Sequence, residues 1–209
     1  MKHGEPDNPR FRYLSRPAYR ICVSRQVEEA IKPHSNGPVV TIPNGIAIER
    51  FEAKQTKEHA SVMIAGKKNP EFALKLYDAL VARSIQASVL IDPVPQEVFA
   101  QQLQKSDIFV GITNRTEGFF LPALEAMAAG CAVVCTDAVG NRGFCIDQQT
   151  ALQPQYLDLE AHVNAVLRLV AEGGLRQQLQ KAGKRMAANY SLEKERQRFY
   201  AFLIEFGLV

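Results

Sequence analysis

The chain has 209 residues, of which 46% are hydrophobic and 22% are charged, a balance typical of an ordinary globular protein. Its formal net charge of +3 is too small to indicate nucleic-acid binding. We find no run of about 18 apolar residues, so we expect no membrane span. Residues 1–20 are polar and basic, unlike a secretory signal. We therefore expect a cytoplasmic protein of one domain, or of one domain plus a small appendage, which touches the inner face of a membrane only peripherally if at all.

The cysteines, histidines and arginines indicate which kinds of site the chain can contain. The four cysteines form no CxxC pair, and three of them fall in or beside apolar segments, so we expect buried, reduced thiols. The four histidines are scattered singly, and we predict neither a metal site nor a cofactor. Five arginines follow one another with no acidic residue between them, at Arg10, Arg12, Arg16, Arg20 and Arg25. Two interpretations of this cluster stay open: a solvated or interdomain surface, and a contact with an anionic membrane or acidic partner.

The predicted elements alternate along the chain. Residues 1–19 contain three prolines and no clear period, so we expect an irregular lead-in or linker remnant. Apolar runs predict strands at residues 20–23, 39–42, 61–65, 88–91, 108–112 and 132–136, and 3.6-residue periodicity predicts helices at residues 26–31, 70–83, 96–105, 122–129, 159–172, 175–189 and 192–206. Residues 20–209 are therefore expected to form an α/β domain, a Rossmann-like open parallel sheet with helices on both faces.

One strand–loop–helix–strand unit, residues 108–137, is the most informative stretch. The apolar strand at 108–112 leads into a polar loop, and a helix is predicted to begin near Pro122, because proline suits the first turn of a helix. Gly130 is expected to end that helix in the left-handed conformation. The loop then lies at the carboxyl end of a parallel strand, where ligands of open α/β sheets bind. Free backbone N–H groups at the helix start favour a phosphate there.

Two carboxylates flank the predicted anion site. Glu117 lies in the loop, and Glu125 lies about one turn, on the order of 5 Å, into the helix. Carboxylates accept hydrogen bonds only, which suits a polyhydroxylated ligand. The neighbours of Glu125 in the helix are almost all apolar, so we expect this carboxylate to be buried and to need a partner.

The stretch Glu117-Gly-Phe-Phe-Leu-Pro-Ala-Leu-Glu125 resembles the E-x7-E signature of family 4-like, retaining glycosyltransferases of the GT-B fold. Residues 42–46 (Ile-Pro-Asn-Gly-Ile) resemble the entry into the C-terminal domain of these enzymes, and residues 190–192 resemble the start of their final helix. The resemblance covers residues 20 to 206 and implies the C-terminal, donor-binding half of a GT-B fold. It also implies that the last helix packs toward an N-terminal domain that precedes residue 20 in the family.

The resemblance implies a role for each site residue. Glu117 would hold hydroxyl groups of the donor sugar, assisted by the amides of Gly118, Phe119 and Phe120, and Glu125 would hold the ribose. Lys67 and Lys68 follow a predicted strand and resemble the family's basic loop, so with the helix start around Leu121 they would hold the donor diphosphate. We assign Glu117 and Lys68 to catalysis, and Lys67, Gly118, Phe119, Phe120, Leu121 and Glu125 to substrate binding.

Three functions remain open on the sequence. The first is an enzyme of polysaccharide biosynthesis that transfers a sugar, with retention, from a nucleotide diphosphate sugar to an unknown acceptor. The second is a donor-binding half that is inactive alone and needs an N-terminal acceptor domain or partner subunit. The third, less favoured, is a nucleotide-sugar epimerase. The chain has neither GxGxxG nor GxxxxGK, so dehydrogenase and P-loop functions are weaker.

Overall fold

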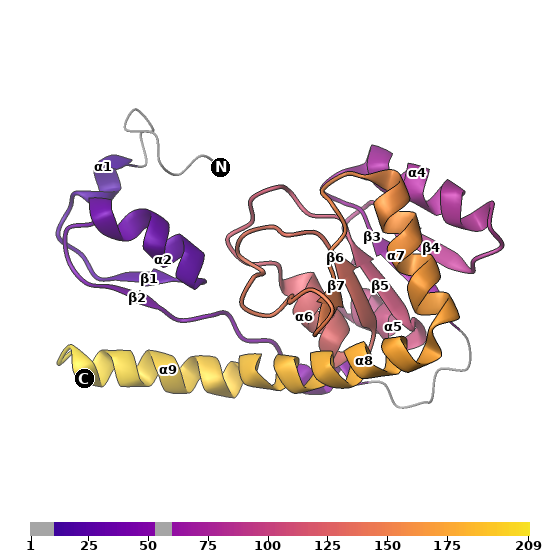
Figure 1. The fold of residues 1–209 in the computed structure, drawn as a ribbon. Coiled ribbons are helices and arrows are strands. Elements are labelled where there is room, and N and C mark those ends of the chain that lie inside the picture. The colour runs from indigo at the N-terminus through magenta and orange to yellow at the C-terminus, as the bar shows by residue number, and fades with distance from the viewer. Residues whose placement is uncertain (1–10, 53–59) are drawn as a thin grey trace.

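The protein consists of two lobes (Figure 1), seen in a computed structural model that describes residues 11–52 and 60–209. The small lobe surrounds a two-stranded parallel sheet and the large lobe a five-stranded one. The small lobe contains α1 (Phe11–Leu14), β1 (Arg20–Cys22), α2 (Arg25–Ile31), the 3-10 turn η1 (Lys32–His34), β2 (Val39–Thr41) and the last helix, α9 (Leu192–Glu205).

The large lobe confirms the predicted fold class. Its sheet has the order β4-β3-β5-β6-β7, with all four pairings parallel. The strands are β3 (Val62–Ala65), β4 (Ala87–Leu90), β5 (Ile108–Gly111), β6 (Ala132–Cys135) and β7 (Ala151–Leu152). The helices are α3 (Ile48–Phe51), α4 (Pro70–Val81), α5 (Gln96–Lys105), α6 (Leu121–Ala128), α7 (Leu159–Ala171) and α8 (Gly173–Ala187), followed by the 3-10 turn η2 (Ala188–Tyr190).

Helices cover both faces of the large sheet. Met63 and Phe109 point into one apolar layer, which α5 and α6 complete, whereas Ile64 and Val110 point into the other, which α4 and α7 complete. All four side chains are inaccessible to solvent. Burial on both faces explains why the strands read as continuous apolar runs. The four cysteines are free and buried, as predicted.

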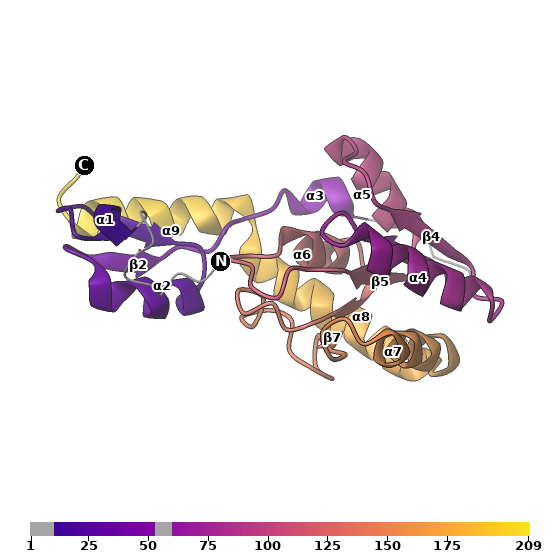
Figure 2. The ribbon, with the colours of Figure 1, turned by 90° about the horizontal axis from the view of Figure 1, so that it is seen from above.

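Two segments join the lobes and lie side by side. Residues 42–47 lead from β2 into the large lobe, and residues 188–191 lead from α8 back to α9. The N–H of Ile46 donates to the Tyr190 carbonyl at 2.8 Å, and the N–H of Leu192 donates to the Ile46 carbonyl at 3.1 Å. Gly45 permits this approach, because a Cβ there would lie 2.6 Å from the Ser191 carbonyl oxygen. α9 then runs along the small lobe (Figure 2), where Tyr19 contacts Phe202 at a ring distance of 5.8 Å.

The structure differs from the sequence prediction in four places, one of which is α3, a helix of four residues that was not predicted. Residues 11–14, within the expected irregular lead-in, form α1, while residues 1–10 lie outside the described range. β1 and β2 form a sheet of their own. This separation was not predicted, because an apolar run indicates that a strand exists but not which sheet it joins. β7 was not predicted, because a strand of two residues is too short to show a period.

Arg20 does not belong to a solvated arginine surface. Its guanidinium donates to five backbone carbonyl groups at 2.7 to 2.9 Å, those of Tyr13, Leu14, Arg16, Ala18 and Asn36. It therefore ties α1 and the following turn to β1. Arg12, Arg16 and Arg25 are exposed, as a surface cluster requires.

Within the described ranges, none of the helices is both long and apolar enough to cross a membrane.

Candidate functional site

The strand–loop–helix unit predicted from residues 108–137 is present. β5 leads into the loop at residues 112–120, α6 begins at Leu121, and Pro122 is its second residue. Gly130 has φ +75, the left-handed conformation expected of the residue that ends this helix. No hydrogen bond within the described residues engages the backbone N–H groups of residues 118–121. The start of α6 therefore offers several donors to a ligand.

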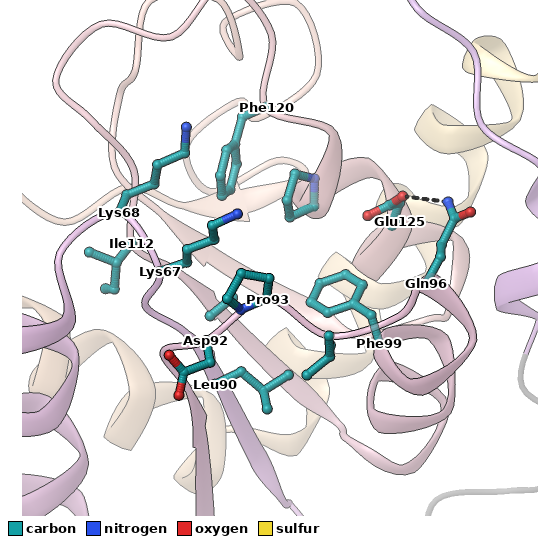
Figure 3. A pocket seen from close by; sticks show the side chains of 13 residues that line it. Lys67, Lys68, Leu90, Asp92, Pro93, Gln96, Phe99, Ile112, Phe120 and Glu125 are labelled. Carbon is teal, nitrogen blue, oxygen red and sulfur yellow. Dashed lines mark hydrogen bonds between the residues drawn. The ribbon is translucent and has the colours of Figure 1, made fainter.

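A cavity of about 310 Å³ lies at the carboxyl edge of the sheet, over β4, β3 and β5 (Figure 3). Lys67 and Lys68 follow β3 and extend toward Phe120, at the start of α6. The loop after β4 contributes an apolar wall with Phe99 of α5. The lining residues are Ala65, Lys67, Lys68, Leu90, Asp92, Pro93, Val94, Gln96, Phe99, Ile112, Phe120, Pro122 and Glu125. Two cations, a buried carboxylate and an apolar wall thus share one hollow.

Glu125 is buried at the end of this cavity, with 8% of its surface exposed. Gln96 donates its side-chain N–H to the Glu125 carboxylate at 3.5 Å, and the Arg50 guanidinium donates in turn to the Gln96 carbonyl oxygen. Burial raises the pKa of Glu125, and the Gln96 hydrogen bond and the Arg50 charge offset this rise in part. The buried carboxylate expected from the sequence therefore has its partner.

Glu117 lies at the edge of the cavity rather than in its wall. Asn114 donates to its carboxylate from the backbone N–H at 3.2 Å and from the side-chain amide at 2.9 Å. Lys68 forms an ion pair with the same carboxylate at 3.4 Å. The backbone is fixed as well, since the N–H of Glu117 donates to the Ala138 carbonyl at 2.9 Å. Glu117 is thus linked to the cavity by its ion pair with Lys68, which lines it.

The remaining predicted site residues lie at different places. Phe120 lines the cavity, whereas Gly118, Phe119 and Leu121 do not. Gly118 faces the small lobe, because a Cβ built on it would lie 3.6 Å from a methyl carbon of Val23. The Phe119 ring packs against Phe144 at a centroid distance of 5.1 Å. The backbone N–H groups of residues 118–121 remain available to a ligand, since no hydrogen bond in the described ranges engages them.

Sequence reasoning missed Gln96, Arg50 and Phe99. Gln96 and Phe99 lie on α5. The 3.6-residue apolar pattern of this helix does not distinguish a residue that faces a ligand from one that faces solvent or the core. A usable signal was the proline-containing loop at residues 92–95, which follows a parallel strand and therefore lies at the ligand-binding edge. Among the residues described, no three His, Cys, Asp or Glu side chains are arranged to hold a metal ion.

Comparison with known proteins gives a family and a set of related folds. The family described as "Glycosyl transferases group 1" matches residues 45–172. No curated protein sequence matches the chain significantly.

Among solved structures, sucrose-phosphate synthase from Thermosynechococcus elongatus aligns with a TM-score of 0.74 at 17% identity, over 96% of this chain and 61% of that one. HepE of Anabaena, solved with UDP and glucose, aligns with a TM-score of 0.71 at 11% identity, over 88% of this chain and 62% of that one. The C-terminal domain of a group 1 glycosyl transferase from Francisella tularensis, LpcC, aligns over its whole length and 71% of this chain, with a TM-score of 0.54 at 18% identity. The chain thus spans less than two thirds of the longer relatives.

Proposed function

Since the chain belongs to the group 1 glycosyl transferases, we propose that its large lobe binds a nucleotide diphosphate sugar for transfer of the sugar, with retention at the anomeric carbon, to an acceptor. One observation carries this proposal. Lys67, Lys68 and Glu125 line a single cavity at the carboxyl edge of a parallel sheet, beside a helix start with free N–H groups. The fold of the relatives, one of which was solved with UDP and glucose, supports the same conclusion.

The cavity offers a different chemistry to each part of such a donor. Its apolar wall, which includes Pro93 and Phe99, suits a nucleobase. The Glu125 carboxylate lies next to that wall and would accept hydrogen bonds from the ribose hydroxyls. Lys67 and the N–H groups at the start of α6 would hold the diphosphate. The donor sugar would then reach toward Glu117.

Lys68 would lie beside the glycosidic bond that breaks, since it lines the cavity and pairs with Glu117. As the diphosphate leaves, negative charge develops on the bridging oxygen, and a lysine beside it lowers the energy of that transition state. Glu117 pairs with Lys68 and is held by Asn114, so it would position the sugar through its hydroxyl groups. We assign Glu117 this positioning role, with the amides of Gly118, Phe119 and Phe120 as further donors, and not the role of a nucleophile.

Calorimetry with UDP, GDP and ADP tests the binding site. We expect at least one of them to bind, and the Glu125→Gln variant to bind it about 10-fold to 100-fold more weakly, because hydrogen bonds to a charged group contribute about 1.5–3 kcal/mol. Glu97→Gln is the matched control, since Glu97 is exposed on α5 and does not line the cavity. If none of the three nucleotides bound, the proposed function would be wrong.

The small lobe favours a second candidate, a donor-binding half that is inactive alone. A sheet of only two strands is marginal without further pairing, and β1 and β2 have no third strand in the described part of the chain. Ile21 of β1 is 43% exposed and Tyr200 of α9 is 60% exposed. A further domain or subunit that carries acceptor-binding residues would complete this lobe. Nucleotide binding without sugar transfer by the chain alone is the outcome expected of this candidate, whereas turnover by the chain alone contradicts it.

A further inference from the structure

A second hollow, of about 390 Å³, lies at the same edge of the large sheet. Gln153, Pro154, Gln155 and Tyr156 follow β7 and form one wall, while Asp137 follows β6. The remaining lining residues are Arg115 and Asp147. The first cavity lies over β4, β3 and β5, so the loop after β5 separates the two hollows. This loop carries Arg115 on one side and Glu117, with its Lys68 contact, on the other.

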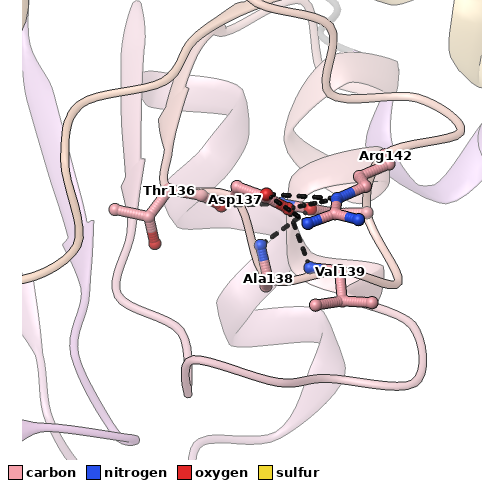
Figure 4. A network of polar contacts seen from close by, with 6 residues as sticks. Thr136, Asp137, Ala138, Val139 and Arg142 are labelled. Carbon is pink, nitrogen blue, oxygen red and sulfur yellow. Dashed lines mark hydrogen bonds and ion pairs between the residues drawn. The ribbon is translucent and has the colours of Figure 1, made fainter.

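The carboxylates of the second hollow are held in place. Arg142 binds Asp137 through two nitrogens, at 2.9 and 2.7 Å (Figure 4). The N–H of Val139 donates to the same carboxylate at 2.9 Å. Arg142 lowers the pKa of Asp137, so this group is an ionised acceptor at neutral pH. Asp147 accepts the backbone N–H of Gln153 at 2.9 Å.

Two donors of the hollow lack an acceptor. The side-chain nitrogen of Gln153 is buried, and it is without a hydrogen-bond partner in the described residues. A buried donor without a partner costs about 1–3 kcal/mol, so an acceptor atom from a ligand would be favoured there. Arg115 is exposed, and no hydrogen bond or ion pair within the described ranges engages its guanidinium.

We propose that this second hollow binds a carbohydrate, the sugar residue of the acceptor that receives the transferred group. The inference rests on the proposed function, since the hollow gains this role from its position across the loop from the donor cavity. A ligand must offer hydroxyl donors to Asp137 and Asp147 and oxygen acceptors to Gln153 and Arg115. A sugar does both, whereas a phosphate offers acceptors to Gln153 and Arg115 but too few hydroxyl donors for the two carboxylates. Tyr156 adds a ring against which a sugar face can pack.

Side-chain amide NMR of the full chain tests the proposal. In a titration with cellobiose, N,N′-diacetylchitobiose and glucuronic acid, we expect at least one sugar to shift the Gln153 amide signal, which the Gln153→Met variant identifies by its loss. We expect that variant to lose at least 10-fold in affinity for the same sugar while its melting temperature stays the same or rises, because it removes an unsatisfied buried donor. Gln149→Met is the matched control, since Gln149 is exposed nearby but does not line the hollow.

The outcomes separate this inference from the proposed function. Nucleotide binding with no Gln153 shift from any of the three sugars overturns the carbohydrate subsite and leaves the donor site standing. A sugar that binds equally well to the wild-type chain and to Gln153→Met also overturns it. Failure of UDP, GDP and ADP to bind overturns the donor site itself, whatever the sugars do.

Discussion

Glu125 occupies an environment that opposes its charge. It projects from a helix whose Leu124 and Ala126 are inaccessible to solvent, and Gln96 and Arg50 compensate for its burial only in part. A carboxylate kept in such a place at a cost in stability is typical of a functional site.

The stability of the chain is expected to depend on pH through Glu125. Its pKa is raised in the folded state, so the folded chain holds this proton more tightly than the unfolded chain does. Stability therefore falls as pH rises from the ordinary glutamate pKa through the raised one, and the loss is complete above it. Glu125→Gln removes this loss of stability, because glutamine does not ionise, and it keeps the hydrogen bond to Gln96. Its melting temperature should therefore exceed that of the wild type by more at pH 8 than at pH 4.

Thermal unfolding at both pH values checks this expectation. Glu97→Gln again serves as the control, because Glu97 is exposed and should give the same difference from wild type at each pH. A Glu125→Gln variant that is less stable than the wild type at pH 8 would show that the Arg50 charge outweighs the desolvation of the carboxylate.

Sequence reasoning reached some site residues and missed others for a physical reason. Lys68 and Glu117 are far apart in the chain, and the family resemblance implied that both belong to one donor site. The carboxyl ends of parallel strands share one edge of a sheet, which explains how the two side chains come to form an ion pair. The burial of Glu125 was predictable from its apolar neighbours. The partner of Glu125 was not, since Gln96 is brought to it by the packing of α5 beside α6, which no local pattern encodes.

At the scale of elements, the loop after β6 supports the loop after β5. Glu117 and Val139 form an isolated parallel bridge, and the N–H of Gly140 donates to the Glu117 carbonyl at 3.0 Å. A Cβ on Gly140 would overlap the carbonyl oxygens of Glu117 and Gly118. Gly140 is therefore required by close backbone contact.

Gly140→Ala is expected to push these two loops apart. We expect a loss of about 1–3 kcal/mol in the free energy of unfolding, the usual cost of overpacking, and weaker nucleotide binding because Glu117 and the start of α6 move. Urea denaturation and calorimetry measure the two effects. Gly174→Ala is the control, since no atom lies within 4 Å of its added Cβ, and it should stabilise α8 by up to about 1 kcal/mol. Equal stability of Gly140→Ala and wild type would contradict this account.

The predicted elements agree best with the structure where the apolar pattern extends over many residues. The prediction for α4 starts at the observed residue, Pro70, because Asn69 caps the helix and its side chain accepts the Phe72 N–H at 3.1 Å. β7 and the separation of β1 and β2 from the main sheet were not predictable. Their existence depends on pairing with distant strands, and a strand of two or three residues carries almost no pattern of its own.

At the scale of the whole molecule, Tyr190 connects the site to the junction of the lobes. Its ring packs against Phe144 at a centroid distance of 5.6 Å and against Phe119 at 6.0 Å, while its backbone carbonyl accepts the Ile46 N–H. Its hydroxyl donates to the Gly143 carbonyl at 3.0 Å. The loops at the site and the connection between the lobes therefore share one side chain.

Tyr190→Phe is expected to lower the free energy of unfolding by about 1 kcal/mol, because it removes one hydrogen bond and keeps the ring contacts. Chemical denaturation measures the change. Tyr77→Phe, on α4, is the control and should be neutral, since no hydrogen bond in the described ranges engages the Tyr77 hydroxyl. An unchanged Tyr190→Phe variant would mean that water replaces the lost interaction.

The return of α9 to the small lobe has a consequence for biosynthesis. β1 and β2 leave the ribosome before any part of the large sheet, but the helix that packs on them is translated after all of it. Until α9 is translated, Tyr19 of the nascent small lobe lacks its contacts with Phe202 and Phe206, while the large lobe can fold as a unit. Chaperones that act on nascent chains would be expected to engage this segment until α9 has been translated.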